Sequence, residues 1–215
     1  MSVRVRDVTS TALGTVWGAE SASENAEAYD AWAPAYERDL FAVGYRLPAM
    51  LAVVVARHLS PESGPILDAG CGSGAQAEPL AMLGYGPLVG IDLSEGMLDA
   101  ARAKGIYAEL HLTGLGPTVD VPGEGAFAGA ICCGALTPGH APPDGMDGLL
   151  AAVRPGGLVA MTLRDDADMD PAYAARADAL VADGRWRRAF TSPPFRGMPY
   201  GEPGITHRVH AFWVL

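Results

Sequence analysis

Two aspartates and three glycines have the spacing of a pocket for a nucleoside-bearing cofactor. Asp68 ends a short apolar run, and Gly70, Gly72 and Gly74 follow it at alternate positions. Glycines let the backbone turn tightly and approach a ligand closely, and the N-terminus of a following helix favours a negative group. Asp92 ends the next apolar run, where a carboxylate accepts hydrogen bonds from ribose hydroxyls. A glycine turn with a capping aspartate and no ligand is the simpler alternative, but the ordered set of strand, turn, helix, strand and acid argues against it.

Strands that alternate with helices are expected to position these residues. Apolar runs predict strands at 65–68, 88–92, 107–112, 127–133, 158–163, 186–191 and 206–214. Apolar residues at helical spacing predict helices at 23–40, 47–59, 77–81, 94–104, 144–153 and 171–183. Pro34 lies inside the first of these, so that helix is expected to be kinked or to be two short helices. The alternation favours an open, mostly parallel α/β sheet covered on both faces over an α+β fold with one segregated sheet.

The composition excludes several classes of protein. Of the 215 residues, 49% are hydrophobic and 19% charged, which indicates a globular chain long enough to bury a core. The formal net charge of −10, with no basic stripe, argues against a nucleic-acid partner. We find no apolar stretch long enough for a membrane span or a signal peptide, so no membrane partner is expected. Cys71, Cys132 and Cys133 form neither a disulfide framework nor a zinc motif, so we expect a cytoplasmic protein with no metal.

One structural domain is expected, in two parts. Residues 1–60 are predicted to form an N-terminal arm and helices that cover the cofactor site, and residues 61–215 to form the core. Residues 1–22 lack clear periodicity, which is typical of a loose or partner-dependent arm. The expected assembly is a monomer or a homodimer.

Two cofactors fit the glycine turn. Gly70-x-Gly72-x-x-Ala75 satisfies the dinucleotide fingerprint, whereas Asp68-x-Gly70-x-Gly72-x-Gly74 resembles motif I of the class I S-adenosylmethionine-dependent methyltransferases. The stretch 90–98 (GIDLSEGML) is similar to the second motif of that family, G-x-D-x-S-x-x-M-L. Residues 154–157 (RPGG) resemble the turn before its fifth strand. The resemblance spans 29–163, and three motifs in the right order make it specific.

Within that family, the chain resembles the methyltransferase-like proteins named after the Williams–Beuren syndrome critical region. This resemblance rests on 29–36 (YDAWAPAY), 67–74 (LDAGCGSG) and 134–136 (GAL). It implies a Rossmann-like three-layer αβα sandwich whose seven-stranded sheet is mostly parallel with an antiparallel last strand. It also implies S-adenosylmethionine as the cofactor and S-adenosylhomocysteine as the product. A small-molecule acceptor is expected because residues 133–136 (CGAL) stand where the N/D-P-P-Y signature of nucleic-acid amino methylation would lie and because the net charge is −10, while a protein acceptor stays open as an alternative. The methylated atom, an oxygen, nitrogen or sulfur, is not determined by the sequence.

The resemblance assigns roles to individual residues. The three glycines of the turn are expected to line the methionine and ribose, Asp68 to orient the turn near the methionine amino group, and Asp92 to bind the ribose hydroxyls. Thr113 stands where many relatives carry an aspartate, so a side-chain contact to the adenine is in doubt there and a backbone contact remains open. The full set expected to bind the cofactor is Tyr29, Tyr36, Asp68, Gly70, Cys71, Gly72, Gly74, Asp92, Leu93, Met97, Thr113, Gly114, Leu115, Cys133 and Gly134.

Methyl transfer needs the acceptor in line and, for a weakly acidic acceptor, a group that removes a proton. His140 and Asp144, after the fourth expected strand, are the candidate catalytic residues, and Asp165 is a further candidate base after the fifth. Arg196, between the last two strands, is hypothesised to bind an acidic acceptor. His207 and His210 are interpreted as structural, because their spacing puts them on opposite faces of a strand.

Two other functions are carried as alternatives. An NAD(P)-dependent oxidoreductase would use Asp92 and the dinucleotide pattern of the turn, but no Tyr-x-x-x-Lys pair supplies its usual acid. A non-catalytic module that binds S-adenosylmethionine or its product is the second alternative, because the sequence fixes no obvious base. Cofactor binding separates the first alternative from a methyltransferase, and turnover of an acceptor separates the second.

Overall fold

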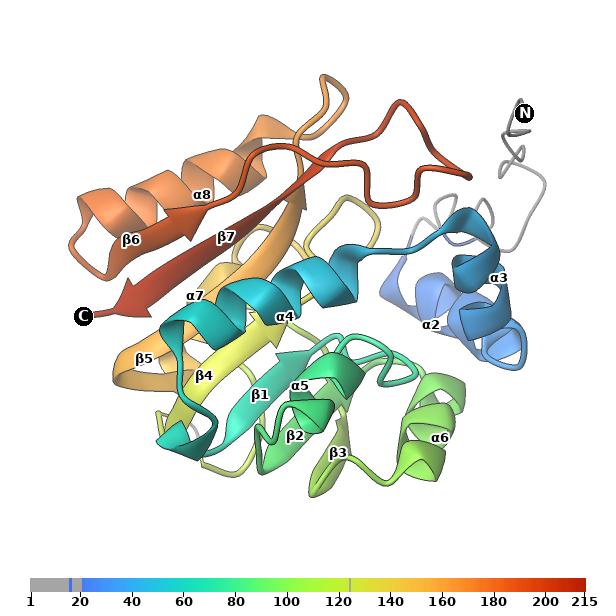
Figure 1. Cartoon of the computed structure of the whole chain (residues 1–215), viewed down its shortest axis with the longest axis horizontal. Helices are drawn as coiled ribbons and strands as arrows, with labels where there is room; N and C mark the ends of the chain where they lie inside the picture. Colours follow the sequence, from blue (N-terminus) through green and yellow to red (C-terminus); the bar gives the residue numbers. More distant parts are fainter. Residues whose placement is uncertain (1–15, 17–20, 124) are drawn as a thin grey trace.

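The computed structural model describes residues 16, 21–123 and 125–215 (Figure 1). The arm expected at residues 1–22 therefore lies almost wholly outside the described residues. Within them, one sheet of seven strands forms the centre of the molecule, with helices on both of its faces (Figure 1). The strands are β1 Ile66–Ala69, β2 Leu88–Asp92, β3 Glu109–Leu112, β4 Phe127–Cys132, β5 Val153–Arg164, β6 Trp186–Thr191 and β7 His207–Val214.

The strand order is β3-β2-β1-β4-β5-β7-β6. Neighbouring strands pair in parallel except at β7, which is antiparallel to both β5 and β6. The mostly parallel sheet with an antiparallel last strand is thus confirmed. The order reverses direction between β1 and β4, and in open α/β sheets a ligand binds beyond the carboxyl ends of the strands at such a switch point.

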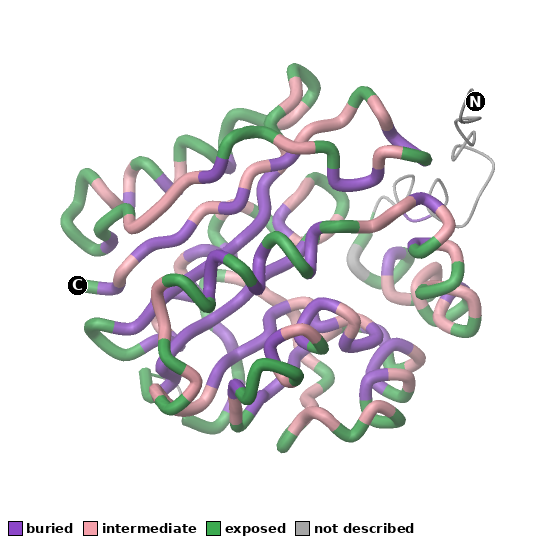
Figure 2. The backbone as a smooth tube through the Cα atoms, in the orientation of Figure 1, coloured by how far each residue is buried: buried purple, intermediate pink, exposed green. Residues whose placement is uncertain are grey.

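Two apolar layers explain why the central strands are buried on both faces. All six residues of β4 and all four of β1 are buried, whereas β3 at the edge has none buried. One face of the sheet packs against the helices α4 and α5, and the other against α7 and α8. Figure 2 shows the result as buried strands through the middle of the molecule and exposed outer turns of the helices. The helices are α2 Ala22–Trp32, α3 Tyr36–Val43, α4 Leu47–His58, α5 Glu78–Met82, α6 Glu95–Lys104, α7 Gly145–Ala152 and α8 Pro171–Ala182, with a short 3-10 helix at Pro61–Ser63.

Pro34 divides the first expected helix into two. α2 ends at Trp32 and α3 begins at Tyr36, so the interpretation as two short helices is confirmed. These two helices lie to one side of the sheet (Figure 1) and form their own apolar cluster, to which Trp32, Leu40 and Met198 belong. α4 instead packs on the sheet, against β5 and β7.

The RPGG turn differs from its expected form. Residues 154–157 were expected to precede the strand, but they lie inside β5 as an irregularity of its pairing with β4. Phe127 of β4 pairs with Val153, and Gly129, two residues on, pairs with Leu158. Gly156 adopts a φ of 77°, which favours glycine, and so the strand bulges without ending.

None of the helices in the described part of the chain is by itself long and apolar enough to cross a membrane. Only α3 and α4, taken together across a bend of 85°, meet that criterion of length and composition. Among the described residues, no three His, Cys, Asp or Glu side chains are grouped so that they could hold a metal ion. The three cysteines are buried and unbridged.

Candidate active site

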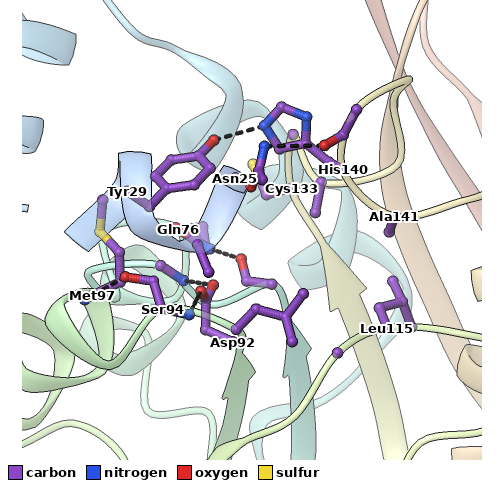
Figure 3. Close-up of a pocket in the computed structure, with 18 of the residues that line it drawn as sticks. Asn25, Tyr29, Gln76, Asp92, Ser94, Met97, Leu115, Cys133, His140 and Ala141 are labelled. Carbon is purple, nitrogen blue, oxygen red and sulfur yellow. Dashed lines mark hydrogen bonds between the residues drawn. The ribbon is translucent and has the colours of Figure 1, made fainter. Parts of the chain in front are cut away.

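A cavity of about 820 Å³, counted with the open solvent at its mouth, lies at the switch point of the sheet. Its walls come from α2 and from the segments that follow β1, β2, β3 and β4 (Figure 3). Twelve of the fifteen residues expected to bind the cofactor line it. They are Tyr29, Tyr36, Gly70, Gly72, Asp92, Leu93, Met97, Thr113, Gly114, Leu115, Cys133 and Gly134.

The glycine turn forms the floor of this first cavity. Gly70 and Gly72 have φ values of 73° and 50°, a left-handed conformation that side chains disfavour. A Cβ atom on Gly70 would lie 2.6 Å from the Cβ of Ala135, so the turn is also closely packed from outside. The side-chain amide of Gln76 donates a hydrogen bond to the carbonyl of Gly70. The space above the turn therefore exists because these positions have no side chain.

Asp92 is held by the backbone of the loops around it. Its Oδ2 accepts a hydrogen bond from the Gly72 amide at 2.8 Å, and its Oδ1 accepts one from the Ser94 amide at 3.0 Å. Burial raises the pKa of Asp92 above its ordinary value, and these backbone hydrogen bonds oppose that shift. A carboxylate has about four acceptor sites, so Asp92 can still accept a hydrogen bond from a ribose hydroxyl. The position fits the cofactor role expected of it.

Three residues expected to touch the cofactor do not line the cavity: Asp68, Cys71 and Gly74. Asp68 is fully buried beneath the turn, where its Oδ2 accepts a hydrogen bond from the Tyr107 hydroxyl at 2.6 Å. Burial raises the pKa of Asp68 to about 7. A Cβ on Gly74 would lie 3.0 Å from the Tyr107 ring. In this structure these residues support the turn from below.

The carboxylate of Asp68 keeps one polar atom without a partner. Its Oδ1 is buried and has no hydrogen-bond partner among the described residues. An unpartnered buried acceptor is unfavourable. Because Asp68 lies beneath the turn and does not line the cavity, the features that fit S-adenosylmethionine are the open glycine turn and the acceptor oxygens of Asp92.

Aromatic side chains of α2 and α3 close the first cavity from above. The Tyr29 hydroxyl lies 2.9 Å from Nε2 of His140, and the Asn25 amide donates to the Gly139 carbonyl at 3.0 Å (Figure 3). The rings of Tyr29 and Tyr36 meet edge to face at 6.1 Å. α2 is therefore joined directly to the loop that follows β4.

Carboxylates fasten the same two helices to the cofactor side of the molecule. Oδ1 of Asp30 accepts hydrogen bonds from the Ser94 hydroxyl at 2.6 Å and from the Gly96 amide at 2.8 Å, at the start of α6. Glu37 accepts a hydrogen bond from the Ser73 hydroxyl at 2.7 Å and pairs with Lys104 at 3.0 Å. The position of α2 and α3 is thus coupled to the loops that surround Asp92.

A second cavity, of about 1060 Å³ on the same measure, adjoins the first. The two share Tyr29, Tyr36, Tyr45 and Gly134 as a common wall. Beyond that wall the second cavity is lined by Trp32, Leu40, Leu47, Leu136, Thr137, Pro138, Thr162, Arg164, Asp168, Met198, Glu202 and His207. Its residues come from parts of the chain that are far apart in the sequence: α2, α3, α4, the loops after β4 and β5, β5 itself, the segment before β7 and the start of β7.

The candidate catalytic residues are separated by the structure. His140 lines the first cavity, and burial lowers its pKa below the ordinary value for histidine. Asp144 is exposed just before α7 and lines neither of these two cavities. Asp165 pairs with Arg208 at 2.8 Å and lines a different depression of the surface.

The segment between β6 and β7 contributes residues other than the expected one. Arg196 is exposed and lines neither cavity. Met198, Glu202 and His207 line the second cavity in its place. His207, interpreted above as structural, faces this space, and its neighbour along the strand, His210, does not.

Sequence reasoning also missed residues of the first cavity. Asn25, Tyr45 and Gln76 line it, and none belongs to a motif. Gln76 offered one signal, because a long polar side chain two residues after the glycine turn is well placed to hydrogen-bond that turn. Asn25 and Tyr45 gave no signal, since their place depends on how α2 and α4 lie in space.

Comparisons with known proteins agree with this geometry. Residues 66–157 match a family described as a methyltransferase domain. Human methyltransferase-like protein 27 is 36% identical over 163 residues, which cover 74% of this chain and 66% of that protein. A trans-aconitate 2-methyltransferase from Sinorhizobium fredii is 32% identical over 146 residues, covering 66% of this chain and 53% of the relative. The chain thus spans 66% and 53% of the lengths of these curated relatives.

Solved structures share the fold at low sequence identity. The magnesium protoporphyrin IX methyltransferase of Synechocystis PCC 6803, solved with S-adenosylmethionine bound, is 17% identical with a TM-score of 0.58, covering 97% of this chain and 93% of that one. The cyclase SpnF is 14% identical with a TM-score of 0.66, covering 91% and 97%. The dinucleotide alternative has no support in these matches. By fold, motifs and relatives, the chain belongs to the class I S-adenosylmethionine-dependent methyltransferase family.

Proposed function

We propose that the chain transfers the methyl group of S-adenosylmethionine to a small molecule bound in the second cavity. The observation that carries this proposal is the common wall of the two cavities, formed by Tyr29, Tyr36, Tyr45 and Gly134. A donor in the first cavity and an acceptor in the second would meet at this wall. Holding two reactants in line accounts for much of the catalysis that methyl transfer needs.

When bound, S-adenosylmethionine supplies a methyl group activated by its sulfonium. The chain's own residues would hold it at both ends. Asp92 offers acceptor sites for the ribose hydroxyls, and Leu93 and Met97 offer apolar surface to the adenine. At the other end, Gly134 would form part of the wall beside the methyl group, and it is held in place because its amide donates to the Thr162 hydroxyl at 2.8 Å.

The small size of the acceptor is supported by the cover over the site. α2 and α3 lie over the first cavity, and Asp30 and Glu37 fasten them to its rim. A polypeptide or a nucleic acid would need this cover displaced, whereas a small molecule fits beneath it. One relative is named for a small acceptor, trans-aconitate, which is consistent with this class.

Binding and turnover test the proposal separately. We expect micromolar binding of S-adenosylmethionine and S-adenosylhomocysteine by calorimetry, and no binding of NADH. Incubation with donor labelled in the methyl group, together with a cell extract split by size, is then expected to label only the small-molecule fraction. Label in the macromolecular fraction would contradict the acceptor class. Cofactor binding without any label would favour the non-catalytic module.

A further inference from the structure

The second cavity contains a carboxyl group that the cofactor site does not use. Glu202 is 6% exposed, and neither of its side-chain oxygens has a hydrogen-bond partner among the described residues. Its backbone amide donates to the Met198 carbonyl at 2.8 Å, which fixes the turn that carries it. A buried carboxyl without partners is costly to the fold. Such a group in a cavity points to a ligand that supplies the missing partner.

A second polar group of the same cavity is also unpaired. His207 is 6% exposed, and its Nδ1 has no partner in the described part of the chain. Burial lowers the pKa of His207 to about 4, so the ring is neutral at physiological pH. A neutral imidazole has one acceptor nitrogen and one donor. The two oxygens of Glu202 can therefore accept hydrogen bonds from a ligand, and Nδ1 of His207 can accept or donate one according to its tautomer.

The charges around Glu202 disfavour an anionic acceptor. Arg164 also lines the cavity, but its guanidinium is engaged by Asp166 through two hydrogen bonds of 2.6 and 2.8 Å. Asp168 adds a further carboxylate to the lining. With its only lining cation already neutralised among the described residues, the cavity favours a positive ligand.

Aromatic rings add an independent preference for a cation. Tyr29, Trp32 and Tyr36 all line the second cavity. The ring centroids of Trp32 and Tyr36 are 4.8 Å apart and the ring planes are inclined by 76°, so the two ring faces point in different directions. Ammonium groups bind to the faces of such rings, and more strongly where water is excluded.

We propose that the methyl acceptor is an amine, and that the Glu202 carboxylate binds its ammonium form and accepts the proton that frees the nitrogen lone pair. This inference rests on the proposed methyl transfer. The freed lone pair forms the new bond to the methyl carbon as the carbon–sulfur bond breaks, and its electrons remain on sulfur. The methylated nitrogen leaves the site as an ammonium, and Glu202 returns to solvent the one proton that it accepted.

Burial gives Glu202 a suitable acidity for this step. It raises the pKa of the carboxyl to about 7, opposed by the positive charge of Arg164 and assisted by the negative charge of Asp166. A general base works best with a pKa near the operating pH. His140, the other candidate base, already has its Nε2 2.9 Å from the Tyr29 hydroxyl, whereas neither Glu202 oxygen has a partner in the part of the chain that the structure describes.

Three probes of one shape test the acceptor class. Phenethylamine, phenethyl alcohol and phenylacetate differ in charge on a common skeleton, and their binding is measured with protein saturated with S-adenosylhomocysteine. We expect the amine to bind about tenfold or more tightly than the carboxylate, and to be methylated when S-adenosylmethionine replaces the product. Equal or tighter binding of phenylacetate, or no binding of the amine, would overturn the inference.

Matched variants test the role of Glu202. Glu202→Gln is expected to lower kcat for the amine by about 10²- to 10⁴-fold and to abolish the rise of kcat/KM with pH near 7, with product affinity unchanged. Glu62→Gln, an exposed carboxylate on the 3-10 helix, serves as the control. His140→Gln is expected to lower kcat for the amine less than Glu202→Gln does. A larger loss of kcat in His140→Gln than in Glu202→Gln, or an unchanged kcat in Glu202→Gln, would contradict the role of Glu202 as the base.

Binding of S-adenosylhomocysteine to the same samples separates the two levels of proposal. If the product does not bind, the methyl-transfer function fails and the amine inference fails with it. If the product binds and phenylacetate or the alcohol is the preferred probe, only the amine inference fails. Thermal midpoints of all variants confirm that each is folded.

Discussion

The two adjoining cavities are built in different ways. In the first, the backbone shapes the cavity: two loop amides donate hydrogen bonds to Asp92, and the backbone of Gly70 and Gly72 forms the open floor. In the second, the carboxyl oxygens of Glu202 and Nδ1 of His207 have no hydrogen-bond partner among the described residues. The proposed cofactor site is therefore preorganised by the fold, while the proposed acceptor site retains polar groups that a ligand would satisfy.

This difference predicts that substitutions in the two cavities have opposite effects on the stability of the protein. A change in the first cavity is expected to weaken the loops and the binding of the cofactor together, because one carboxylate serves both. A change in the second cavity is expected to move stability and activity in opposite directions, because removing an unpaired charge stabilises the fold while it harms function. If substitutions in the two cavities change stability and function in the same way, this difference between the cavities does not hold.

Asp92→Ala is expected to have the largest effect. It removes the acceptor for two loop amides and for the ribose, so product affinity should fall by about 10²- to 10³-fold, which is about 3–4 kcal/mol. Calorimetric titration with S-adenosylhomocysteine measures it. Asp99→Ala, an exposed carboxylate on α6, is the control. A Kd within about threefold of the wild type would show that Asp92 only shapes the loop.

Glu202→Gln is expected to stabilise the protein in a pH-dependent way. The pKa of Glu202 in the folded state is about 7, above its ordinary value of 4.5. Stability contributed by the protonated carboxyl is therefore present below about pH 4.5 and is lost as the pH rises through 7. The glutamine variant does not titrate, so it should gain on the order of 2–3 kcal/mol at pH 8 and nothing at pH 4.5.

Thermal unfolding at the two pH values measures this gain. A stabilisation of that size raises Tm by roughly 5–10 °C in a chain of this length. Glu62→Gln, whose side chain is exposed, should show no such rise. A lower Tm for Glu202→Gln at pH 8 would mean that the carboxylate has a stabilising partner, and the contrast between the cavities would be lost.

Tyr107→Phe tests the support beneath the first cavity. Its hydroxyl donates to the buried Asp68 and opposes the rise in the pKa of that carboxyl, which burial brings to about 7. Without this donor the pKa rises further, so the loss of stability should reach about 1–2 kcal/mol at pH 8 and be smaller at pH 5, where Asp68 is protonated in the folded state.

Tyr85→Phe gives a matched control for that variant. The Tyr85 hydroxyl donates to the uncharged carbonyl of Leu59, so its removal should cost the same at both pH values. Thermal unfolding of both variants at pH 5 and pH 8 checks the difference. A pH-independent loss in Tyr107→Phe would show that Asp68 does not titrate with the fold.

The same contrast explains which parts could be predicted from the sequence. The mostly parallel seven-stranded sheet with an antiparallel last strand follows from the alternation of strands and helices together with the family resemblance, and the boundaries of β2 and β6 match the predicted ranges. The first cavity follows too, because its residues directly succeed strands whose ends meet at one edge of the sheet. Local spacing along the chain was enough to bring Gly72 next to Asp92.

The second cavity could not be predicted in this way. Trp32, Arg164 and Glu202 belong to no common motif, and they meet only because α2, β5 and the segment before β7 fold over the same strand ends. Arg196 was the expected acceptor contact, yet it is exposed, while Glu202 six residues later is buried. Which side of an irregular segment faces inward depends on packing that spacing does not encode.

The smallest predicted effect concerns the cover that the two cavities share. Asp30 fastens α2 to the start of α6 by accepting hydrogen bonds from Ser94 and Gly96, and α2 carries Tyr29, which lines both cavities. Asp30→Ala should loosen α2 and cost about 1 kcal/mol, so product dissociation should accelerate by about three- to tenfold. Because Tyr29 belongs to both walls, the KM of the acceptor should rise by a similar factor.

Stopped-flow displacement of S-adenosylhomocysteine measures the first effect, and steady-state kinetics the second. Glu27→Ala, an exposed residue on the same helix, controls for a general loss of helix stability. If Asp30→Ala changes only product dissociation, α2 covers the cofactor alone. If both constants move together, one helix closes the preorganised cavity and the unpaired one at once, and the order in which donor and acceptor bind then depends on a single movement.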